Sequence, residues 1–206
     1  AARLEVLTAE IDDPGPVYDC VVFYDGTIHR AVVDTTEKGD LTALKPLAAF
    51  GTEREYGTFG VADQLNFAVQ FFDNGTMLSI VCDSSPHGTH VASIAADAHN
   101  GVAPDAQLIS FKIGEPRLGT METGPSLARA MKLAAVCKCD VINLSYGEAV
   151  QVPDSGRLIE LAEDVVWKHN IVFVAAAGNQ GPALSTVNAL GGTASACIGV
   201  AAYVSP

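Results

Sequence analysis

The sequence predicts an α/β protein in which a strand-rich first part precedes a parallel sheet with helices. After residue 84, apolar strand-like runs alternate with helical segments, which is the pattern of right-handed βαβ units in a parallel sheet. Before residue 83, an Asp-Gly and an Asn-Gly dipeptide each stand between two strand-like runs, and such dipeptides are a strong local signal for a β-hairpin. We therefore expect a strand-rich accessory module at residues 1–83 and an α/β segment at residues 84–206.

Two antiparallel hairpins are expected in the first part. The stretch between them, residues 37–59, is polar and broken by glycines, which predicts a loop with a helical turn. Antiparallel pairing places these strands outside the parallel sheet. The paired runs are residues 17–24 with 27–34 around Asp25-Gly26, and residues 66–73 with 76–81 around Asn74-Gly75.

The second part opens with a short helix that carries a histidine at its mouth. Pro86 fixes the chain just before His87, and Val91, Ile94 and Ala95 recur at helical spacing, which predicts an apolar face. Downstream we expect strands at residues 106–113, 140–145, 171–177 and 197–204, with helices at residues 123–137 and 155–169.

Two polar segments follow directly on the expected parallel strands. Tyr146-Gly147 ends one strand and Gly178-Asn179 ends the next. Functional sites of open parallel sheets lie at the carboxyl ends of the strands. The two segments are therefore expected at one edge of the sheet.

The composition excludes several classes of partner. The 206 residues are 49% hydrophobic and 17% charged, enough to bury a core, and the net charge of −12 argues against nucleic acid and against an anionic membrane surface. No apolar run reaches membrane-spanning length, and the first residues lack the pattern of a signal peptide. Five scattered cysteines, an odd number, favour reduced thiols and a cytoplasmic location.

His87 by itself admits three interpretations. It can be a general base, because the unperturbed pKa of histidine is about 6.5 and small shifts make it usable at neutral pH. It can be a surface residue at a helix cap. It can also bind a metal ion together with His90 and the nearby Cys82 and Asp83.

Three motifs in a fixed order favour the first interpretation. They are His-Gly-Thr-His-Val-Ala at residues 87–92, Val-Ile-Asn-Leu-Ser-Tyr-Gly at 141–147, and Ala-Gly-Asn-Gln-Gly at 177–181. Together they resemble the subtilisin-like serine peptidases, the subtilases. The resemblance implies a parallel sheet with helices on both faces, His87 as the catalytic base and Asn179 as a donor to the oxyanion. It also implies that Ser145, Tyr146 and Gly147 form an edge to which an extended peptide substrate adds as a strand.

The sequence segments around these motifs narrow the resemblance to one branch of the family, whose members release tripeptides from the free amino terminus of oligopeptides. The segments that match this branch lie at residues 12–20, 120–124, 145–149 and 166–170. This branch implies that Glu122 and Glu148 bind the substrate ammonium, whereas each glutamate taken alone is an ordinary solvated loop residue. It further implies a large cytoplasmic homo-oligomer that needs no cofactor and no metal.

The chain departs from the family pattern in two places. It contains no serine nucleophile block, and Asp34-Thr35-Thr36 resembles the aspartate block only in part, because the glycine is missing. We therefore interpret the chain as the middle of a catalytic domain, with residues 1–83 as an insertion. Two alternatives stay open: a catalytically incomplete homologue that binds peptides, and a metal-binding or redox module. The second alternative would use Cys82, His87, His90, Cys137 and Cys139.

Overall fold

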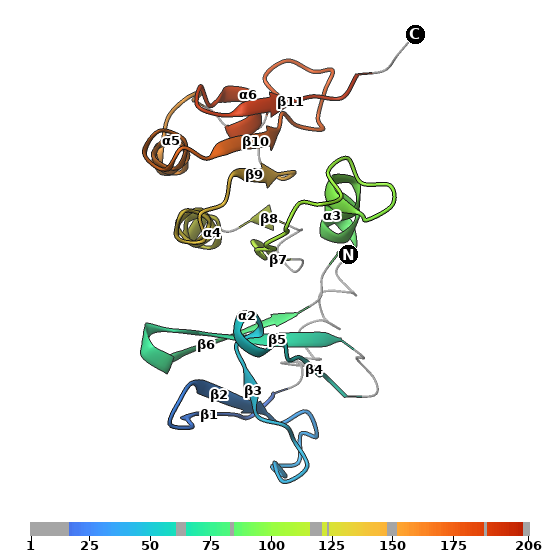
Figure 1. The fold of residues 1–206 in the computed structure, drawn as a ribbon, viewed down its shortest axis with the longest axis vertical. Coiled ribbons are helices and arrows are strands. Elements are labelled where there is room, and N and C mark those ends of the chain that lie inside the picture. Colours follow the sequence, from blue (N-terminus) through green and yellow to red (C-terminus); the bar gives the residue numbers. More distant parts are fainter. Residues whose placement is uncertain are drawn as a thin grey trace, which may run out of the picture. The chain divides into compact units, whose positions relative to one another are not determined.

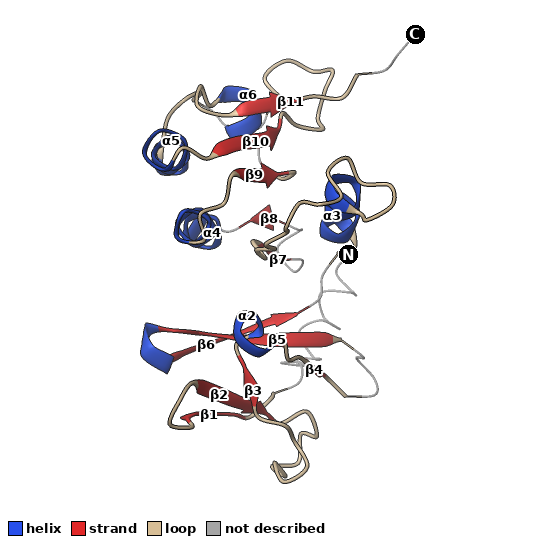
Figure 2. Cartoon of the chain, in the orientation of Figure 1, coloured by secondary structure: helices blue, strands red, loops and turns tan. Residues whose placement is uncertain are grey.

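The computed structural model describes residues 17–60, 65–82, 85–115, 121–122, 124–147, 152–187 and 189–203. The chain divides into two compact units, Ala1–Asp83 and Ser84–Pro206 (Figure 1). Each unit has its own strands and its own apolar core, and Figure 2 shows where helices and strands alternate along the chain. None of the helices in the described part of the chain has the length and apolar character that crossing a membrane requires.

The first hairpin of unit 1 forms where the Asp-Gly dipeptide predicts it. Strand β1 (Cys20–Tyr24) pairs antiparallel with β2 (His29–Val33), and β2 also pairs with β3 (Leu47–Ala48). The connection has four residues instead of two, because the Asp25 carboxylate accepts the backbone N–H groups of Thr27 and Ile28 at 2.8 and 2.9 Å. This side-chain bonding replaces the tight turn that the dipeptide alone suggests.

The second hairpin is also confirmed. Strand β5 (Asn66–Phe72) pairs antiparallel with β6 (Met77–Cys82) through the 3₁₀ turn η1 (Asp73–Gly75). Residues 37–59, predicted as a loop with a helical turn, also contain two short strands. They hold β3, the helix α2 (Phe50–Glu53) and β4 (Gly57–Thr58), which pairs with β5. Strands of two residues are too short to show a period of two in the sequence.

The core of unit 1 lies between these strands. Phe67 is buried and stacks on Phe59 with 4.4 Å between ring centroids. At the exposed side, Arg30 donates two parallel hydrogen bonds to Glu53 at 2.8 and 2.9 Å, the bidentate geometry that suits guanidinium and carboxylate. The buried cluster consists of Ala31, Val33, Leu47, Phe59, Phe67 and Val69.

Unit 2 is built on a parallel sheet of three strands, as the alternating pattern predicts. Strand β10 (Val172–Ala176) lies in the centre, with β9 (Val141–Leu144) on one side and β11 (Ile198–Val200) on the other, and both pairings are parallel (Figure 1). The sheet places the carboxyl ends of β9 and β10 next to each other, which is the geometry that positions the candidate site.

Three helices pack into one apolar cluster with this sheet. They are α4 (Gly124–Val136), α5 (Arg157–His169) and α6 (Ala189–Thr193), and α4 lies beside α5 (Figure 1). Both α4 and α5 were predicted from helical spacing. Helix α5 ends where Asn170 adopts the left-handed conformation at φ 56°, a usual helix terminator.

One expectation for unit 2 is wrong. Residues 106–113 form no strand; the strands in this region are the short β7 (Gly114–Glu115) and β8 (Met121–Glu122), which pair antiparallel. An apolar β-branched run becomes a strand only when another strand completes its hydrogen bonds, and β9 pairs only with β10 in the described part of the chain.

The expected histidine helix is confirmed as α3 (His87–Ala96). It forms where predicted, but no residue in it is buried, and Ile94 on the expected apolar face is 55% exposed. Helical spacing shows which residues share a face, but burial needs a neighbour that covers that face.

Candidate active site

The strands that precede the predicted site residues of the sheet end at one edge. Leu144 of β9 is the register partner of Ala175 of β10, so the segments that follow the two strands leave the sheet at the same end. Ser145–Gly147 and Ala177–Asn179 therefore both leave the sheet at its carboxyl edge, where Figure 1 shows β9 beside β10. This is the place where open parallel sheets carry their functional groups.

Glycines shape the backbone on both sides of this edge. Gly147 has φ 152° and Gly178 has φ 124°. These are backbone conformations that residues with a Cβ atom rarely adopt. Asn179 follows directly, is exposed, and its backbone N–H donates to the side-chain oxygen of Gln180 at 3.0 Å. The amide side chain of Asn179 is thus held on a turn just beyond a central strand.

The side chains of the Ser145–Gly147 segment face different surroundings. The Ser145 hydroxyl accepts a hydrogen bond from the side-chain amide of Asn143 at 3.0 Å. The Tyr146 ring packs against the core, and its hydroxyl is buried with no hydrogen-bond partner in the described part of the chain. The hydroxyl of Tyr146 is therefore not available to a peptide at this edge.

His87 is the first residue of α3, as predicted for a base at a helix mouth. Its backbone N–H donates to the Ser85 hydroxyl at 3.2 Å, and the residue is exposed. Gly88 beside it borders an open groove of about 340 Å³, which Leu108 and Ser110 line from the other side. No contact between His87 and Asn179 occurs among the described interactions, so a shared cleft stays a prediction.

Of the two glutamates expected to bind an ammonium group, the structure describes only the backbone of Glu122. The backbone of Glu122 lies in β8, where it is the register partner of Gly114, while its side chain is outside the described set. Glu148 lies outside the described residues. Their convergence stays a prediction.

Asp34, the partial match to an orienting aspartate, is used by its own loop. It is only 1% exposed. One carboxylate oxygen accepts from the Thr36 hydroxyl at 2.6 Å and the Thr36 N–H at 2.9 Å, and the other accepts from the Gly39 N–H at 2.7 Å. The bond from the Thr36 hydroxyl, supported by these backbone donors, holds the pKa of Asp34 below its ordinary value. The geometry is that of a structural loop anchor.

The residues of the metal alternative do not form a group. No three His, Cys, Asp or Glu side chains placed to hold a metal ion occur within the described ranges. Cys82 and Cys139 are half-buried and Cys137 is exposed, and burial raises the pKa of the Cys139 thiol. A raised pKa keeps a thiol protonated and less able to act as a ligand.

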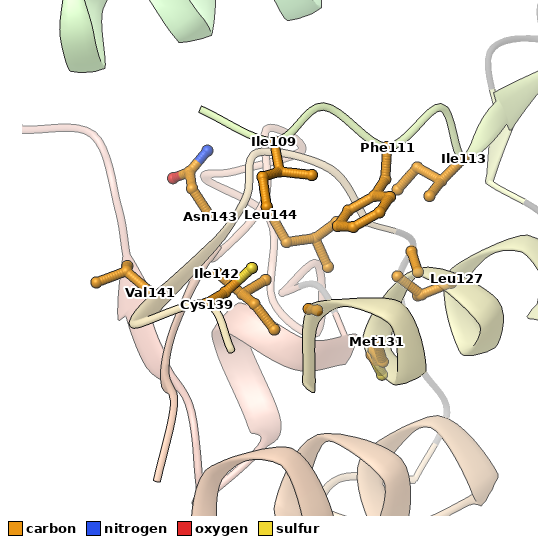
Figure 3. Close-up of a pocket in the computed structure, with 12 residues that line it drawn as sticks. Ile109, Phe111, Ile113, Leu127, Met131, Cys139, Val141, Ile142, Asn143 and Leu144 are labelled. Carbon is orange, nitrogen blue, oxygen red and sulfur yellow. The ribbon is translucent and has the colours of Figure 1, made fainter. Parts of the chain in front are cut away.

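A cavity of about 140 Å³ lies beside β9, and all four residues of the strand line it (Figure 3). Ile109, Phe111 and Ile113 reach toward Leu144 and Leu127 across it. Since residues 106–113 do not hydrogen-bond to β9 as a strand, their side chains fill this space incompletely. None of the described residues of the predicted peptidase site lines the cavity, whereas Cys139 of the metal alternative does.

Two contributors to the edge were missed from the sequence, Asn143 and Gln180. The signal for Asn143 was available, since an asparagine interrupts the apolar run Val141–Leu144. The sequence gives no signal for Gln180, because polar residues are common in a turn such as Gly-Asn-Gln-Gly. Its role depends on how its side chain folds back onto Asn179.

Comparison with known proteins places this geometry in context. Residues 52–205 match the model described as the subtilase family. The whole chain aligns at 51% identity with tripeptidyl-peptidase 2 of Oryza sativa subsp. japonica, of which it covers 16%. At 46% identity, 92% of the chain aligns with tripeptidyl-peptidase 2 of Drosophila melanogaster, of which it covers 14%. A crystal structure of tripeptidyl peptidase 2 matches 99% of the chain at TM-score 0.81 and 42% identity, and the chain covers 18% of it. The chain thus spans less than a fifth of each of these relatives.

Proposed function

The chain belongs to the subtilase family and has its subtilisin-like α/β fold; on this premise we propose that it forms the central part of the catalytic domain of a serine exopeptidase. The enzyme releases tripeptides from the free amino terminus of oligopeptides. The observation that carries the proposal is the shared carboxyl edge of β9 and β10, because Ser145–Gly147 follows one of these strands and Asn179 follows the other.

Hydrolysis of an amide needs a nucleophile, a base and donors for the oxyanion that forms. In the proposed mechanism His87 takes the proton from a serine and passes it to the leaving amine. The side-chain N–H₂ of Asn179 donates to the oxyanion. The serine and the orienting aspartate belong to other parts of the whole protein, because no matching block occurs in these 206 residues.

The substrate lies along the Ser145–Gly147 edge as an added strand, and its backbone approaches Gly147 closely because no side chain stands there. Glu122 and Glu148 bind its α-ammonium. A buried ammonium without a partner is costly, so a pair of carboxylates at a fixed distance from the cut selects peptides with a free amino terminus. Two neighbouring carboxylates repel each other, and one can hold a proton until the cationic terminus arrives.

The relatives named tripeptidyl-peptidase 2 support this choice within the family. We further propose that unit 1 is an insertion in the catalytic domain and that helices cover both faces of the complete sheet. The whole protein is a large homo-oligomer in the cytoplasm. Its partners are peptide substrates.

The competing proposal is a catalytically incomplete subtilase segment that binds peptides at the same edge without cutting them. The two differ in turnover, because binding alone needs no base. A binding protein would tolerate the loss of His87, whereas a peptidase would not.

The test uses the purified full-length protein and a tripeptide-aminomethylcoumarin substrate, either with a free amino terminus or N-acetylated. We expect rapid release of the fluorophore from the free substrate and little from the acetylated one. His87→Ala should abolish turnover without unfolding the protein. Asn179→Ala should lower kcat by roughly 100- to 1000-fold, a range taken from the loss of the corresponding donor in a subtilisin, a relative of this chain.

Glu148→Gln separates the tripeptidyl specificity from the chemistry. It should raise KM for the free substrate and leave the poor acetylated substrate unchanged, because only the ammonium contact is weakened. Equal turnover of both substrates by the wild-type protein would contradict the exopeptidase, and turnover that survives His87→Ala would contradict the peptidase mechanism.

A further inference from the structure

We propose that Asn143 is a positioning residue for the peptide-binding edge. By donating its side-chain amide to the Ser145 hydroxyl, it orients that hydroxyl so that its own proton points to a backbone carbonyl of the substrate. The inference rests on the proposed function. It assigns a role to a residue within β9 that is not part of Ser145–Gly147, the segment expected to contact the substrate.

The first observation is the face of the sheet on which Asn143 lies. Ile142 and Leu144 of β9 face the core, so Val141 and Asn143 lie on the opposite face. Asn143 is the register partner of Val174, which is itself the partner of Ile198. Asn143 is the polar exception on this face among the described residues of the three strands, which are Val141, Asn143, Val172, Val174, Ala176, Ile198 and Val200.

The second observation is that asparagine is a poor choice at this position on general grounds. It is depleted in strands, whereas valine and isoleucine suit a half-exposed pleated surface. A residue that weakens a strand is expected where its side chain makes a specific contact. Asn143 is the polar residue among the labelled side chains of the cavity beside β9, which are otherwise apolar apart from Cys139 (Figure 3).

The contact is the hydrogen bond to Ser145. Residues two apart on an extended chain lie on the same face, and the Asn143 Nδ2 to Ser145 Oγ distance of 3.0 Å is within the usual range. Asn143 is exposed and Ser145 is half-buried. The bond therefore reaches from the open face of the sheet to the edge where the strand ends.

The direction of the bond decides what Ser145 can do. A hydroxyl has one proton to donate and two lone pairs that accept. Because the Asn143 amide donates, Ser145 uses a lone pair in this bond and keeps its proton free. A hydroxyl held in one orientation loses less freedom when it binds a peptide carbonyl than one that rotates.

The test is steady-state kinetics of the full-length protein on the free-amino tripeptide-aminomethylcoumarin substrate. Asn143→Val removes the donor and improves strand propensity, so the variant should fold. We expect KM to rise by roughly two- to tenfold, the worth of one hydrogen bond, with kcat unchanged because the contact exists equally in ground and transition states. Asn143→Asp should raise KM at least as much, since a carboxylate only accepts and takes the Ser145 proton for itself.

The matched control is Val141→Ala, on the same strand and the same face two residues away, which should stay within about twofold of the wild type. In a Ser145→Ala background, Asn143→Val should have no further effect, because the hydroxyl it orients is gone. If Asn143→Asp kept wild-type KM, or if the two substitutions were additive, the inference would be overturned while the peptidase stood. A wild-type protein without turnover would overturn the proposed function and this inference with it.

Discussion

Asp34 illustrates at the scale of a single residue how sequence resemblance and physical role can differ. Its position after an apolar run resembles an aspartate block, yet its carboxylate accepts hydrogen bonds from Thr36 and Gly39 within its own loop. A buried carboxylate is stable only when it is paired or hydrogen-bonded in this way. Asp40 repeats the pattern toward Thr42 in an exposed position, which makes the two aspartates a matched pair.

We expect Asp34→Ala to lower the urea midpoint of unfolding at pH 7 clearly more than Asp40→Ala, since it removes a buried carboxylate that accepts three hydrogen bonds. The folded-state pKa of Asp34 lies below its ordinary value of 3.8. Its contribution to stability is therefore present above that ordinary value and lost as the pH falls through the lowered one.

The difference between wild type and Asp34→Ala should accordingly narrow when unfolding is measured at successively lower pH below about 4. The check is urea unfolding of the full-length protein followed by circular dichroism. A deficit for Asp34→Ala that stayed constant down to the lowest pH would contradict the assignment of this carboxylate as a charged loop anchor.

At the scale of secondary-structure elements, the packing of α6 on β11 depends on the absence of side chains. A Cβ built at Gly199 would collide with the backbone oxygen of Gly191 in α6. Gly199 is also the register partner of Ala175, in the strand that leads to Asn179. This close approach of Gly199 to Gly191 fixes where α6 packs on β11, beside the strand that leads to Asn179.

Gly199→Ala should therefore destabilise the protein by about 1–3 kcal/mol, the usual cost of overpacking. The matched control is Gly124→Ala at the start of α4, where an added Cβ meets nothing within 4 Å and where stability should change little. Thermal unfolding of the two full-length variants compares them directly. Equal melting temperatures would show that α6 shifts away from β11 without cost.

At the scale of the whole chain, two apolar cores are formed by residues of separate units. The Phe67 cluster belongs to Ala1–Asp83 and the Phe173 cluster to Ser84–Pro206. Proteins open locally in cooperative units that follow such clusters. Damage to one core is therefore expected to loosen that unit first.

Phe67→Ala should cost about 3–5 kcal/mol and should speed hydrogen exchange mainly in residues 17–82. Phe50→Ala offers a matched control, because Phe50 is 47% exposed and contributes little buried area. Hydrogen exchange with mass spectrometry on the full-length protein measures both variants. Equal acceleration in peptides from both units would mean that the chain opens as one cooperative body.

The sequence alone determined the features that depend on residues near each other in the chain. Helical spacing predicts α4 and α5, and the turn dipeptides predict both hairpins, because periodicity and turn chemistry act over a few residues. The motif order also placed His87 at the start of a helix and Asn179 just after a strand, as found. These positions needed no knowledge of the fold.

Only the tertiary structure decided what depends on segments far apart in the sequence. It left residues 106–113 without a strand partner in the described part of the chain and α3 without a buried face. It directed the Asp34 carboxylate to its own loop and set the register in which Leu144 of β9 lies opposite Ala175 of β10. Strand pairing, burial and hydrogen-bond direction are properties of contacts between segments, and no local pattern in the sequence records which segments will meet.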